Sequence, residues 1–362
     1  MRRYHVLNGS PSYFDDQLSA LNIQGDEMSQ KVLEFDQQRI LGTKFILSDC
    51  LIVRNNHYLN LVESALSRLG SLIEDLTSGD ADIFVHNPPL NLLNHIHSSE
   101  EHGRCTFEKC EDNLPRIASI DDVKKSINLV KQSVLGQDAA LDSIGKSLFY
   151  LSKVKREKPF VLMFYGKSSL GKTETAKAIA RVFYDGKMLE KHMSMFGTTG
   201  YASYLFGDKL NERSLGYDLF QRESNLVFLD EIDKCSDAFH AAFYSLFDSP
   251  RYLDTAYEVD IRNLVVILTS NYLSEKDIRK HLGDPIFNRI DKCIEFVDFS
   301  PSEQIALLEE EIDKQINEIS ESLDKNELFL VAARKISTKG ANGRVIKFAV
   351  REAIEEALYE SC

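Results

Sequence analysis

Short runs of consecutive apolar residues, separated by polar segments, mark three strands in the middle of the chain. The runs lie at residues 160–165, 225–229 and 264–271, and such runs are typical of strands that are buried on both faces of a sheet. The first run is followed, after a short loop, by a helical pattern from Thr173 to Phe183. We therefore predict an α/β domain with a parallel sheet over about residues 121–299.

The C-terminal part of the chain shows helical periodicity. Apolar residues recur there at spacings of three or four, and residues 345–358 form a second amphipathic stretch. The Ser300-Pro301 pair before them is a natural boundary between structural elements. We therefore predict a helical region over residues 300–362. The apolar residues of its first helix are Ile305, Leu308, Ile312, Ile316 and Ile319.

The N-terminal region, residues 1–118, has weaker patterns and is expected to be an α+β domain. Residues 43–53 predict a strand pair or one long bent strand, and Asn113-Leu-Pro-Arg marks the end of the region. Between them a 3-4 spacing of apolar residues predicts one helix. This helix either faces the core of its own domain, which we favour, or serves as a docking helix similar to a coiled-coil seam. Its apolar residues are Leu59, Val62, Leu66, Leu69, Ile73 and Leu76.

Residues 166–173 read Gly-Lys-Ser-Ser-Leu-Gly-Lys-Thr, which is a complete phosphate loop directly after the first strand. Glycines let the backbone turn tightly enough for successive N–H groups to surround an anion, and the next helix adds its positive N-terminal end. We expect ATP here, with Lys172 on the β and γ phosphates and the Thr173 hydroxyl on Mg²⁺. The predicted phosphate-binding residues are Gly166, Lys167, Ser168, Ser169, Leu170, Gly171, Lys172 and Thr173.

The other two strands also end in polar residues. Asp230 and Glu231 follow the second strand, and Asn271 ends the third. Ligands of open parallel sheets bind beyond the carboxyl ends of the strands, so these side chains should meet the phosphate loop. We expect Asp230 to hold Mg²⁺ through its water shell and Glu231 to orient the attacking water. An acidic pair alone is more often a solvated surface, but the phosphate loop favours the catalytic interpretation.

A second candidate site, for Zn²⁺, lies in the N-terminal region. Cys105 and Cys110, with two of His95, His97 and His102, could close a tetrahedral zinc site, because thiolate and imidazole are the preferred ligands of that ion. The spacing of the cysteines is permissible but not distinctive. The alternative, which we favour, is a polar surface loop with two ordinary thiols.

Composition narrows the choice of partners. The chain has 362 residues, enough for two or three domains, and a net charge of −13, which argues against a broad nucleic-acid or anionic-membrane footprint. The basic run at residues 153–158 is better explained as a solvated approach to the first strand than as a DNA site. No apolar run is long enough for a membrane span or a signal peptide, and six scattered cysteines form no disulfide framework. We therefore expect a cytoplasmic protein with reduced thiols.

Six short motifs follow one another in a defined order, at residues 134–137, 166–173, 228–231, 268–271, 287–291 and 342–344. In order and approximate spacing they resemble the AAA+ module of the Clp unfoldases, specifically the second ATPase ring of the two-ring members. The resemblance covers about residues 121–362. It implies a P-loop NTPase domain with flanking helices, a helical lid, and a hairpin within residues 248–263.

The resemblance also implies roles for individual residues. Val134 and Leu135 would pack on the adenine ring, and Asn271 would be the first sensor. Arg289 would be the arginine finger that projects into the site of the neighbouring subunit, where a fixed planar charge stabilises the transition state. Arg344 would be the second sensor on the γ-phosphate, although the Gly-Ala-Arg of the family is Asn-Gly-Arg here.

One segment departs from the family. Clp unfoldases carry a Gly-Tyr-Val-Gly pore loop, whose aromatic ring grips the translocating polypeptide, shortly after a Leu-x-Gly stretch. Residues 204–207 match that stretch, but the charged segment 208–216 follows and no Gly-Tyr-Val-Gly is present. Tyr201 is an alternative aromatic, although a structural role for it is the better interpretation. Processive threading is therefore in doubt, whereas ATP hydrolysis is not.

These observations predict an ATP-hydrolysing, Clp-like AAA+ protein that forms a homo-oligomeric ring, a hexamer by family resemblance, and remodels a protein partner. The alternative is an ATP-controlled assembly switch or scaffold that threads nothing. A nucleic-acid remodeller is disfavoured by the net charge. The N-terminal region would dock the partner or substrate.

Overall fold

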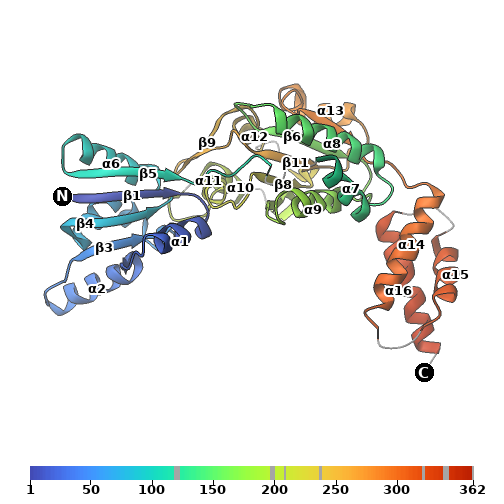
Figure 1. Cartoon of the computed structure of the whole chain (residues 1–362), viewed down its shortest axis with the longest axis horizontal. Helices are drawn as coiled ribbons and strands as arrows, with labels where there is room; N and C mark the ends of the chain where they lie inside the picture. Colours follow the sequence, from blue (N-terminus) through green and yellow to red (C-terminus); the bar gives the residue numbers. More distant parts are fainter. Residues whose placement is uncertain are drawn as a thin grey trace.

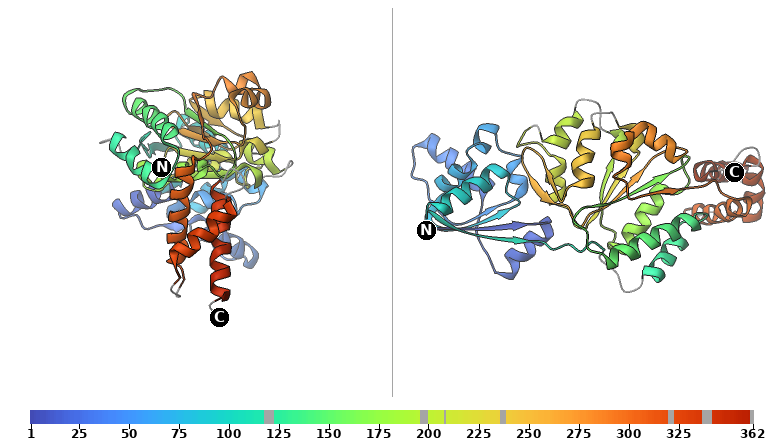
Figure 2. Two further views of the ribbon diagram at one scale, coloured as in Figure 1. Left: turned by 90° about the vertical axis from the view of Figure 1, so that its right-hand side faces the viewer. Right: turned by 90° about the horizontal axis from the view of Figure 1, so that it is seen from above.

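The computed structural model is an elongated molecule, with an N-terminal α/β unit at one end, a second α/β unit in the middle and a helical unit at the other end (Figures 1 and 2). The described residues are 1–117, 123–195, 200–207, 209–235, 239–319, 323–336 and 342–360. None of the described helices is both long and apolar enough to cross a bilayer.

The N-terminal unit is built around a five-stranded sheet in the order β2-β3-β4-β1-β5, and every pairing in it is parallel. Alternate strand residues face helix α1 on one side and helices α5 and α6 on the other, each in its own buried apolar cluster. The expectation of an α+β domain is therefore corrected: the all-parallel sheet with helices on both faces makes this an α/β unit. The strands are β1 (Arg2–Asn8), β2 (Asp26–Glu27), β3 (Ser48–Val53), β4 (Thr77–His86) and β5 (Cys105–Glu111).

The helix expected over residues 59–76 is interrupted. Leu66 and the apolar residues after it are buried in the N-terminal core, as the favoured interpretation requires, but Val62 is 67% exposed and extended. Residues 43–53 yield one strand, β3, with a register shift between Ser48 and Cys50. The helices of this unit are α1 (Pro11–Ala20), α2 (Met28–Leu41), α3 (Asn55–Tyr58), α4 (Glu63–Leu66), α5 (Leu69–Leu76) and α6 (Leu90–Glu101).

The middle unit contains a second parallel five-stranded sheet, in the order β12-β6-β11-β8-β7. The three strands expected from apolar runs are its three central strands, and they are buried at every residue. The two edge strands have a more polar pattern and carry no such signal. The strands are β6 (Phe160–Tyr165), β7 (Leu189–His192), β8 (Leu226–Asp230), β11 (Val265–Thr269) and β12 (Lys292–Glu295).

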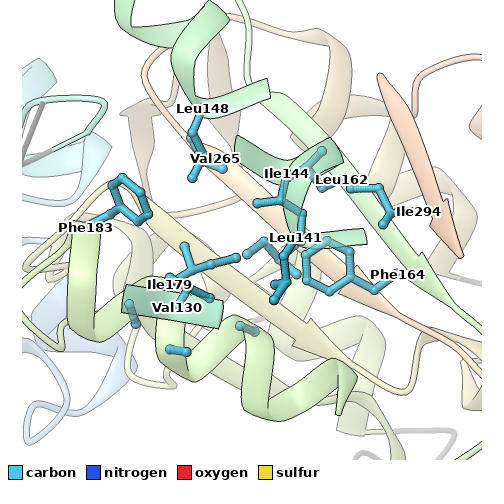
Figure 3. Packing of buried hydrophobic residues seen from close by; sticks show 14 of the residues in the cluster. Val130, Leu141, Ile144, Leu148, Leu162, Phe164, Ile179, Phe183, Val265 and Ile294 are labelled. Carbon is cyan, nitrogen blue, oxygen red and sulfur yellow. The ribbon is translucent and has the colours of Figure 1, made fainter. Parts of the chain in front are cut away.

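Helices cover both faces of this sheet. On one face α7 (Val123–Ser133), α8 (Asp138–Lys153) and α9 (Lys172–Phe183) pack on alternate residues of the strands, including Leu162, Phe164 and Val265 (Figure 3). The other face carries Val161, Met163 and Val266. It packs against α10 (Gly200–Phe206), α11 (Leu215–Phe220), α12 (Phe239–Asp248), α13 (Glu275–Phe287) and the antiparallel hairpin β9 (Arg251–Leu253) with β10 (Glu258–Asp260).

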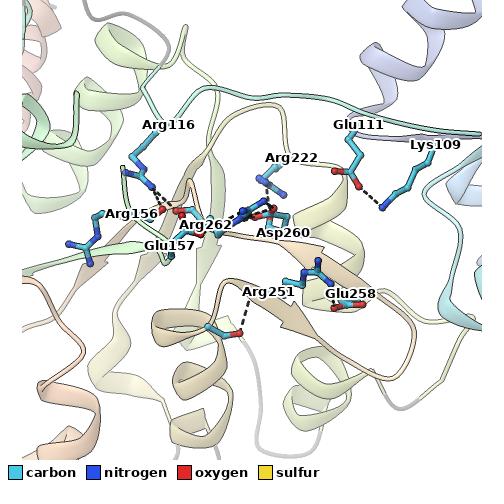
Figure 4. Close-up of polar contacts among 11 residues, drawn as sticks. Lys109, Glu111, Arg116, Arg156, Glu157, Arg222, Arg251, Glu258, Asp260 and Arg262 are labelled. Atoms are coloured by element: carbon cyan, nitrogen blue, oxygen red, sulfur yellow. Dashed lines mark hydrogen bonds and ion pairs between the residues drawn. The ribbon is translucent and has the colours of Figure 1, made fainter. Parts of the chain in front are cut away.

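The expected hairpin also meets the N-terminal unit. Leu90 N–H donates to the Ala256 carbonyl at 2.7 Å, and the Tyr257 hydroxyl donates to Asn55 Oδ1 at 3.3 Å. Beside the hairpin, Arg116 lies in the segment that connects the two units. Its guanidinium donates hydrogen bonds to the carbonyls of Val154, Arg156 and Arg262 and holds this segment in place (Figure 4). The Arg156 guanidinium of the basic run is itself paired with Asp291 at 2.7 Å, and Lys158 Nζ lies 2.6 Å from Asp248 Oδ1.

The C-terminal unit consists of α14 (Pro301–Ile316), α15 (Lys325–Ile336) and α16 (Gly343–Glu360) around their own apolar cluster. Ser300 caps α14 and forms a capping box with Glu303, so the predicted boundary is a helix start. Two of these helices were expected from the sequence, whereas α15 was not. Ile305, predicted on the buried face, is 50% exposed.

Candidate nucleotide site

The phosphate loop connects β6 to α9 and needs its glycines. Gly166 has φ of 135°, and a Cβ there would lie 2.3 Å from the carbonyl oxygen of Phe296. Gly171, with φ of 92°, begins α9 in the left-handed region, and Ser169 also has a positive φ of 60°. The loop therefore adopts a backbone that side chains at its two glycine positions would disrupt.

Lys172 is buried at the first position of α9 and points back across the loop. Its Nζ donates to the carbonyls of Gly166 at 2.7 Å and Lys167 at 2.6 Å, and lies 3.5 Å from Asn271 Oδ1. Burial lowers the pKa of Lys172 to about 8, against the opposing influence of Asp233 and Asp230. The two carboxylates only partly offset the positive charge of Lys172 when no anion is bound. Such a residue is suited to binding phosphate groups.

Asp230 lies at the end of β8, opposite the loop. Its Oδ1 accepts from the hydroxyl of Thr173 at 3.3 Å and from the hydroxyl of Thr269 at the end of β11. Carboxylate and hydroxyl oxygens are suitable Mg²⁺ ligands, so the pair Thr173 and Asp230 fits the ion that accompanies a bound triphosphate.

Glu231 follows Asp230 in a strained conformation, with φ of 58°. Its N–H donates to Thr269 Oγ1 at 2.9 Å, so one threonine holds both acidic residues in place. Non-glycine residues in the left-handed region are uncommon and concentrate at functional sites.

Asn271 is held beside them by Asp233. The Asn271 N–H lies 3.2 Å from Asp233 Oδ1 and its side-chain Nδ2 lies 3.4 Å from Asp233 Oδ2. From the lid side, the Gly343 N–H donates to the Ser169 carbonyl at 3.0 Å, which brings the start of α16 to the loop.

These elements enclose one cavity of about 360 Å³. Three strand ends, the phosphate loop and the lid all contribute to it, as predicted from the order of the motifs. It is lined by Ser168, Ser169, Gly171, Lys172, Thr173, Glu174, Asp230, Glu231, Thr269, Ser270, Asn271 and Arg344.

Comparison with known proteins agrees with this geometry. Residues 157–326 match the family model described as AAA domain (Cdc48 subfamily). Residues 157–326 form an AAA+ ATPase domain. This match is in agreement with the expected class of ATPase.

Individual relatives of the AAA+ domain are Clp proteins. The chain is 24% identical to chaperone protein ClpB of Wolinella succinogenes over 274 residues, which cover 64% of this chain and 31% of that protein. It is 26% identical to the ATP-dependent Clp protease ATP-binding subunit ClpE of Lactococcus lactis, over 64% of this chain and 35% of that protein. Against the AAA+ ATPase ClpV1 of Pseudomonas aeruginosa the identity is 30%, over 42% and 18% of the two chains. The match thus spans about a third or less of the length of these relatives.

Three sets of expected site residues lie outside the cavity lining of the AAA+ domain. The first consists of Gly166, Lys167 and Leu170 of the phosphate loop. Val134 is buried behind the phosphate loop, 3.4 Å from the position of a Cβ on Gly171, and Leu135 is half-buried next to it. Arg289 follows α13 and contacts Asp248, Tyr244 and the Pro285 carbonyl of its own chain. The structure does not bring Arg289 into the cavity formed by its own chain.

The segment in place of the pore loop is described only in part. Tyr204 donates to Asp218 Oδ2 at 2.7 Å, and Leu205 is buried, so this part of the segment packs on the domain. The Tyr201 side chain and Asp208 lie outside the described residues.

The candidate zinc site is not formed. Cys105 and Cys110 lie five residues apart on β5, on opposite faces and roughly 16 Å from each other along the strand, too far for one ion. His95 contacts Glu74 at 2.9 Å, His97 packs edge-on against Phe107, and His102 contacts the Ser98 carbonyl. Among the residues that the structure describes, no group of three or more His, Cys, Asp and Glu side chains is arranged to hold a metal ion.

Sequence reasoning missed three residues near the cavity. Thr269 and Asp233 lie within or beside recognised motifs, so their polar character next to Asn271 and Glu231 was a usable signal. His192, at the end of β7, contacts Asp230 at 3.3 Å. It had no sequence signal because β7 itself was not predicted.

Proposed function

We propose that this chain binds ATP with Mg²⁺ in the described cavity, hydrolyses it as part of a ring, and uses the energy to remodel a protein partner. The observation that carries the proposal is the convergence of Lys172, Asp230, Glu231 and Asn271 at one sheet edge, around a phosphate loop. This set provides a cation for phosphates, a metal ligand, a base and a polar amide, which phosphoryl transfer requires.

Binding comes first in the proposed mechanism. Loop N–H groups and the N-terminus of α9 receive the phosphates, and Lys172 shifts its hydrogen bonds from the Gly166 and Lys167 carbonyls to phosphate oxygens. Thr173 and Asp230 would hold Mg²⁺, which would neutralise charge on the triphosphate. Val134 and Leu135 offer apolar cover for adenine.

Hydrolysis then depends on Glu231. Thr269 holds its backbone N–H, and the left-handed turn carries its carboxylate over the cavity, where it accepts a proton from the attacking water. Asn271, held by Asp233, and Arg344, from the lid, bind the γ-phosphate and stabilise charge on its oxygens.

The ring follows from Arg289. Because this guanidinium lies outside the cavity of its own chain, we assign it to the site of a neighbouring subunit, where it acts as the arginine finger. Clp resemblance supports a hexamer. The described cysteines are all free, as in a reducing compartment, and this supports a cytoplasmic location.

A second candidate is an ATP-controlled assembly switch. The charged segment 208–216 that replaces the Gly-Tyr-Val-Gly loop favours it, because a channel without that aromatic grip has less hold on a polypeptide. In this version, nucleotide state governs ring formation or the docking of the N-terminal unit, and no substrate is threaded.

One experiment tests the proposal and separates the two candidates. The full chain is incubated with ATP and a fluorescent protein that carries an unstructured tag, and ATP turnover and loss of fluorescence are followed together. Turnover with unfolding supports the remodeller. Turnover with release of a bound partner and no unfolding supports the switch, and the partner is obtained by co-purification with the Glu231→Gln variant. Absence of turnover in the assembled protein would refute both.

A further inference from the structure

The edge strand β7 ends beside the metal-binding position. It pairs in parallel with β8, and its last residue, His192, is in register with Asp230. Side chains alternate along a strand, so Glu190 and His192 share one face while Lys191 points to the other and pairs with Asp218. The strand thus presents a carboxylate and an imidazole on the face that adjoins Asp230.

His192 bridges two carboxylates. Its Nδ1 lies 3.3 Å from Asp230 Oδ2, and its Nε2 lies 3.2 Å from Glu190 Oε1. The Glu190 oxygen is buried without a hydrogen bond, and its other neighbour, the ammonium group of Lys177, is more distant at 3.8 Å. A buried carboxylate oxygen is costly without a polar neighbour, and the imidazole is the nearest one, so this contact also holds the ring of His192 in place.

The two oxygens of Asp230 consequently have different environments. Oδ1 accepts from Thr173 and Thr269, on the side of the phosphate loop, whereas Oδ2 faces His192. Rotation of the carboxylate would exchange these oxygens. A partner on Oδ2 opposes that rotation and keeps Oδ1 directed toward Thr173.

We propose that His192, oriented by Glu190, is a positioning residue that fixes the Asp230 carboxylate for Mg²⁺ binding. This inference rests on the proposed function of the cavity. Groups that hold metal ligands commonly contribute 10- to 100-fold to metal affinity. Because the His192 side chain is 42% exposed, we expect the lower end, roughly tenfold.

The test measures metal-dependent nucleotide binding instead of turnover. The full chain carrying Glu231→Gln, which prevents hydrolysis, is titrated with a fluorescent ATP analogue at a series of Mg²⁺ concentrations and again in EDTA. His192→Ala should raise the Mg²⁺ concentration for half-maximal binding roughly tenfold and leave the affinity in EDTA unchanged. Lys191→Ala, on the same strand but the opposite face, is the matched control and should change neither.

Two conservative variants distinguish positioning from a general role in the strand. In His192→Asn the amide nitrogen replaces Nδ1 and can still reach Asp230, whereas in His192→Gln the amide replaces Nε2 and reaches toward Glu190. The Asn variant should therefore bind Mg²⁺ nearly as the parent does, and the Gln variant should resemble His192→Ala. This comparison stands even where the Ala variant folds poorly.

Several outcomes would overturn the inference. An unchanged or lower Mg²⁺ requirement in His192→Ala would show that the imidazole does not assist the metal, and equal behaviour of the Asn and Gln variants would show that contact with Asp230 is irrelevant. If the Glu231→Gln parent binds nucleotide with Mg²⁺ while the variants match it, only this inference fails. If the parent shows no metal-dependent binding, the proposed function fails with it.

Discussion

Asp248 Oδ2 lies 3.2 Å from Nε of Arg289 and anchors this arginine within its own chain. The guanidinium also lies over the Tyr244 ring, 4.8 Å from its centre, and donates to the Pro285 carbonyl at 2.7 Å. Hydrogen bonding with Lys158, and the charge of Arg289, hold the pKa of Asp248 below its usual value, so this carboxylate remains charged beside the arginine. The proposed finger is thus supported in a defined position at the end of α12 before any neighbour is present.

Arg289→Ala should therefore leave nucleotide binding intact and slow turnover on the order of 10³-fold, because the finger stabilises transition-state charge. Turnover at increasing protein concentration is the measurement. The control is Arg279→Ala, an exposed arginine on α13 that pairs with Asp284. Equal turnover in Arg289→Ala and wild type would refute the assignment.

Mixed assemblies give a sharper test of the shared site. An Arg289→Ala subunit keeps its own Glu231, and a Glu231→Gln subunit keeps its finger. If each site is completed by a neighbour, mixing the two inactive variants should restore turnover at the interfaces where a finger meets an intact Glu231. No recovery in assemblies shown by mass to contain both variants would contradict a finger acting between subunits.

Glu231→Gln alone should bind ATP with wild-type affinity and lose turnover by roughly 10²- to 10⁴-fold, the usual contribution of a general base. Glu174→Gln is a matched control, because Glu174 lines the same cavity from the first turn of α9 but does not follow a strand end. Binding of a fluorescent analogue and phosphate release are the measurements. Normal turnover in Glu231→Gln would exclude this residue as the base.

Gly166→Ala should abolish nucleotide binding and lower the melting temperature. The new Cβ would lie 2.3 Å from a backbone oxygen of Phe296, and φ of 135° is itself unfavourable for alanine, at a cost of about 1–3 kcal/mol for the backbone alone. Gly79→Ala is the control, because nothing lies within 4 Å of its Cβ position. A Gly166→Ala protein that binds ATP normally would show that the loop can adopt another backbone.

The N-terminal unit should lose stability in mild acid because of His86. Burial lowers the pKa of His86 to about 4, and its Nε2 contacts the Gly9 carbonyl at 2.9 Å. Since the unfolded chain takes up this proton at about pH 6.5, the free energy of unfolding falls as pH decreases from 6.5 to 4, by up to about 3 kcal/mol, and no further below pH 4.

Denaturant unfolding of wild type and His86→Gln at several pH values isolates this contribution. The difference in unfolding free energy between the two proteins should change between pH 6.5 and 4. Parallel pH curves for wild type and His86→Gln would show that His86 titrates normally in the folded protein.

Sequence reasoning worked best where one local segment carries the whole signal. The phosphate loop and the three central strands are continuous in sequence, and their burial on both faces leaves an unmistakable apolar run. It was less successful at residues 95–110, where neither the candidate zinc site nor the favoured surface loop is formed, because Cys105 and Cys110 lie on a strand and Cys105 is buried. Cys105 and Cys110 lie five residues apart along strand β5, and no local sequence pattern predicted that strand.

The sequence by itself determined that strand, loop and helix follow one another at residues 160–183, and that acidic and amide residues end the next two central strands. Only the tertiary structure decided that β7 lies beside β8, which brings His192 to Asp230, and that Thr269 holds Asp230 and Glu231 together. The physical reason is that the backbone conformation and burial of one element impose a periodic pattern of apolar and polar residues on a continuous stretch of sequence. The pairing of an edge strand, or a contact between side chains 39 residues apart, depends on how the whole chain packs and imposes no such local pattern.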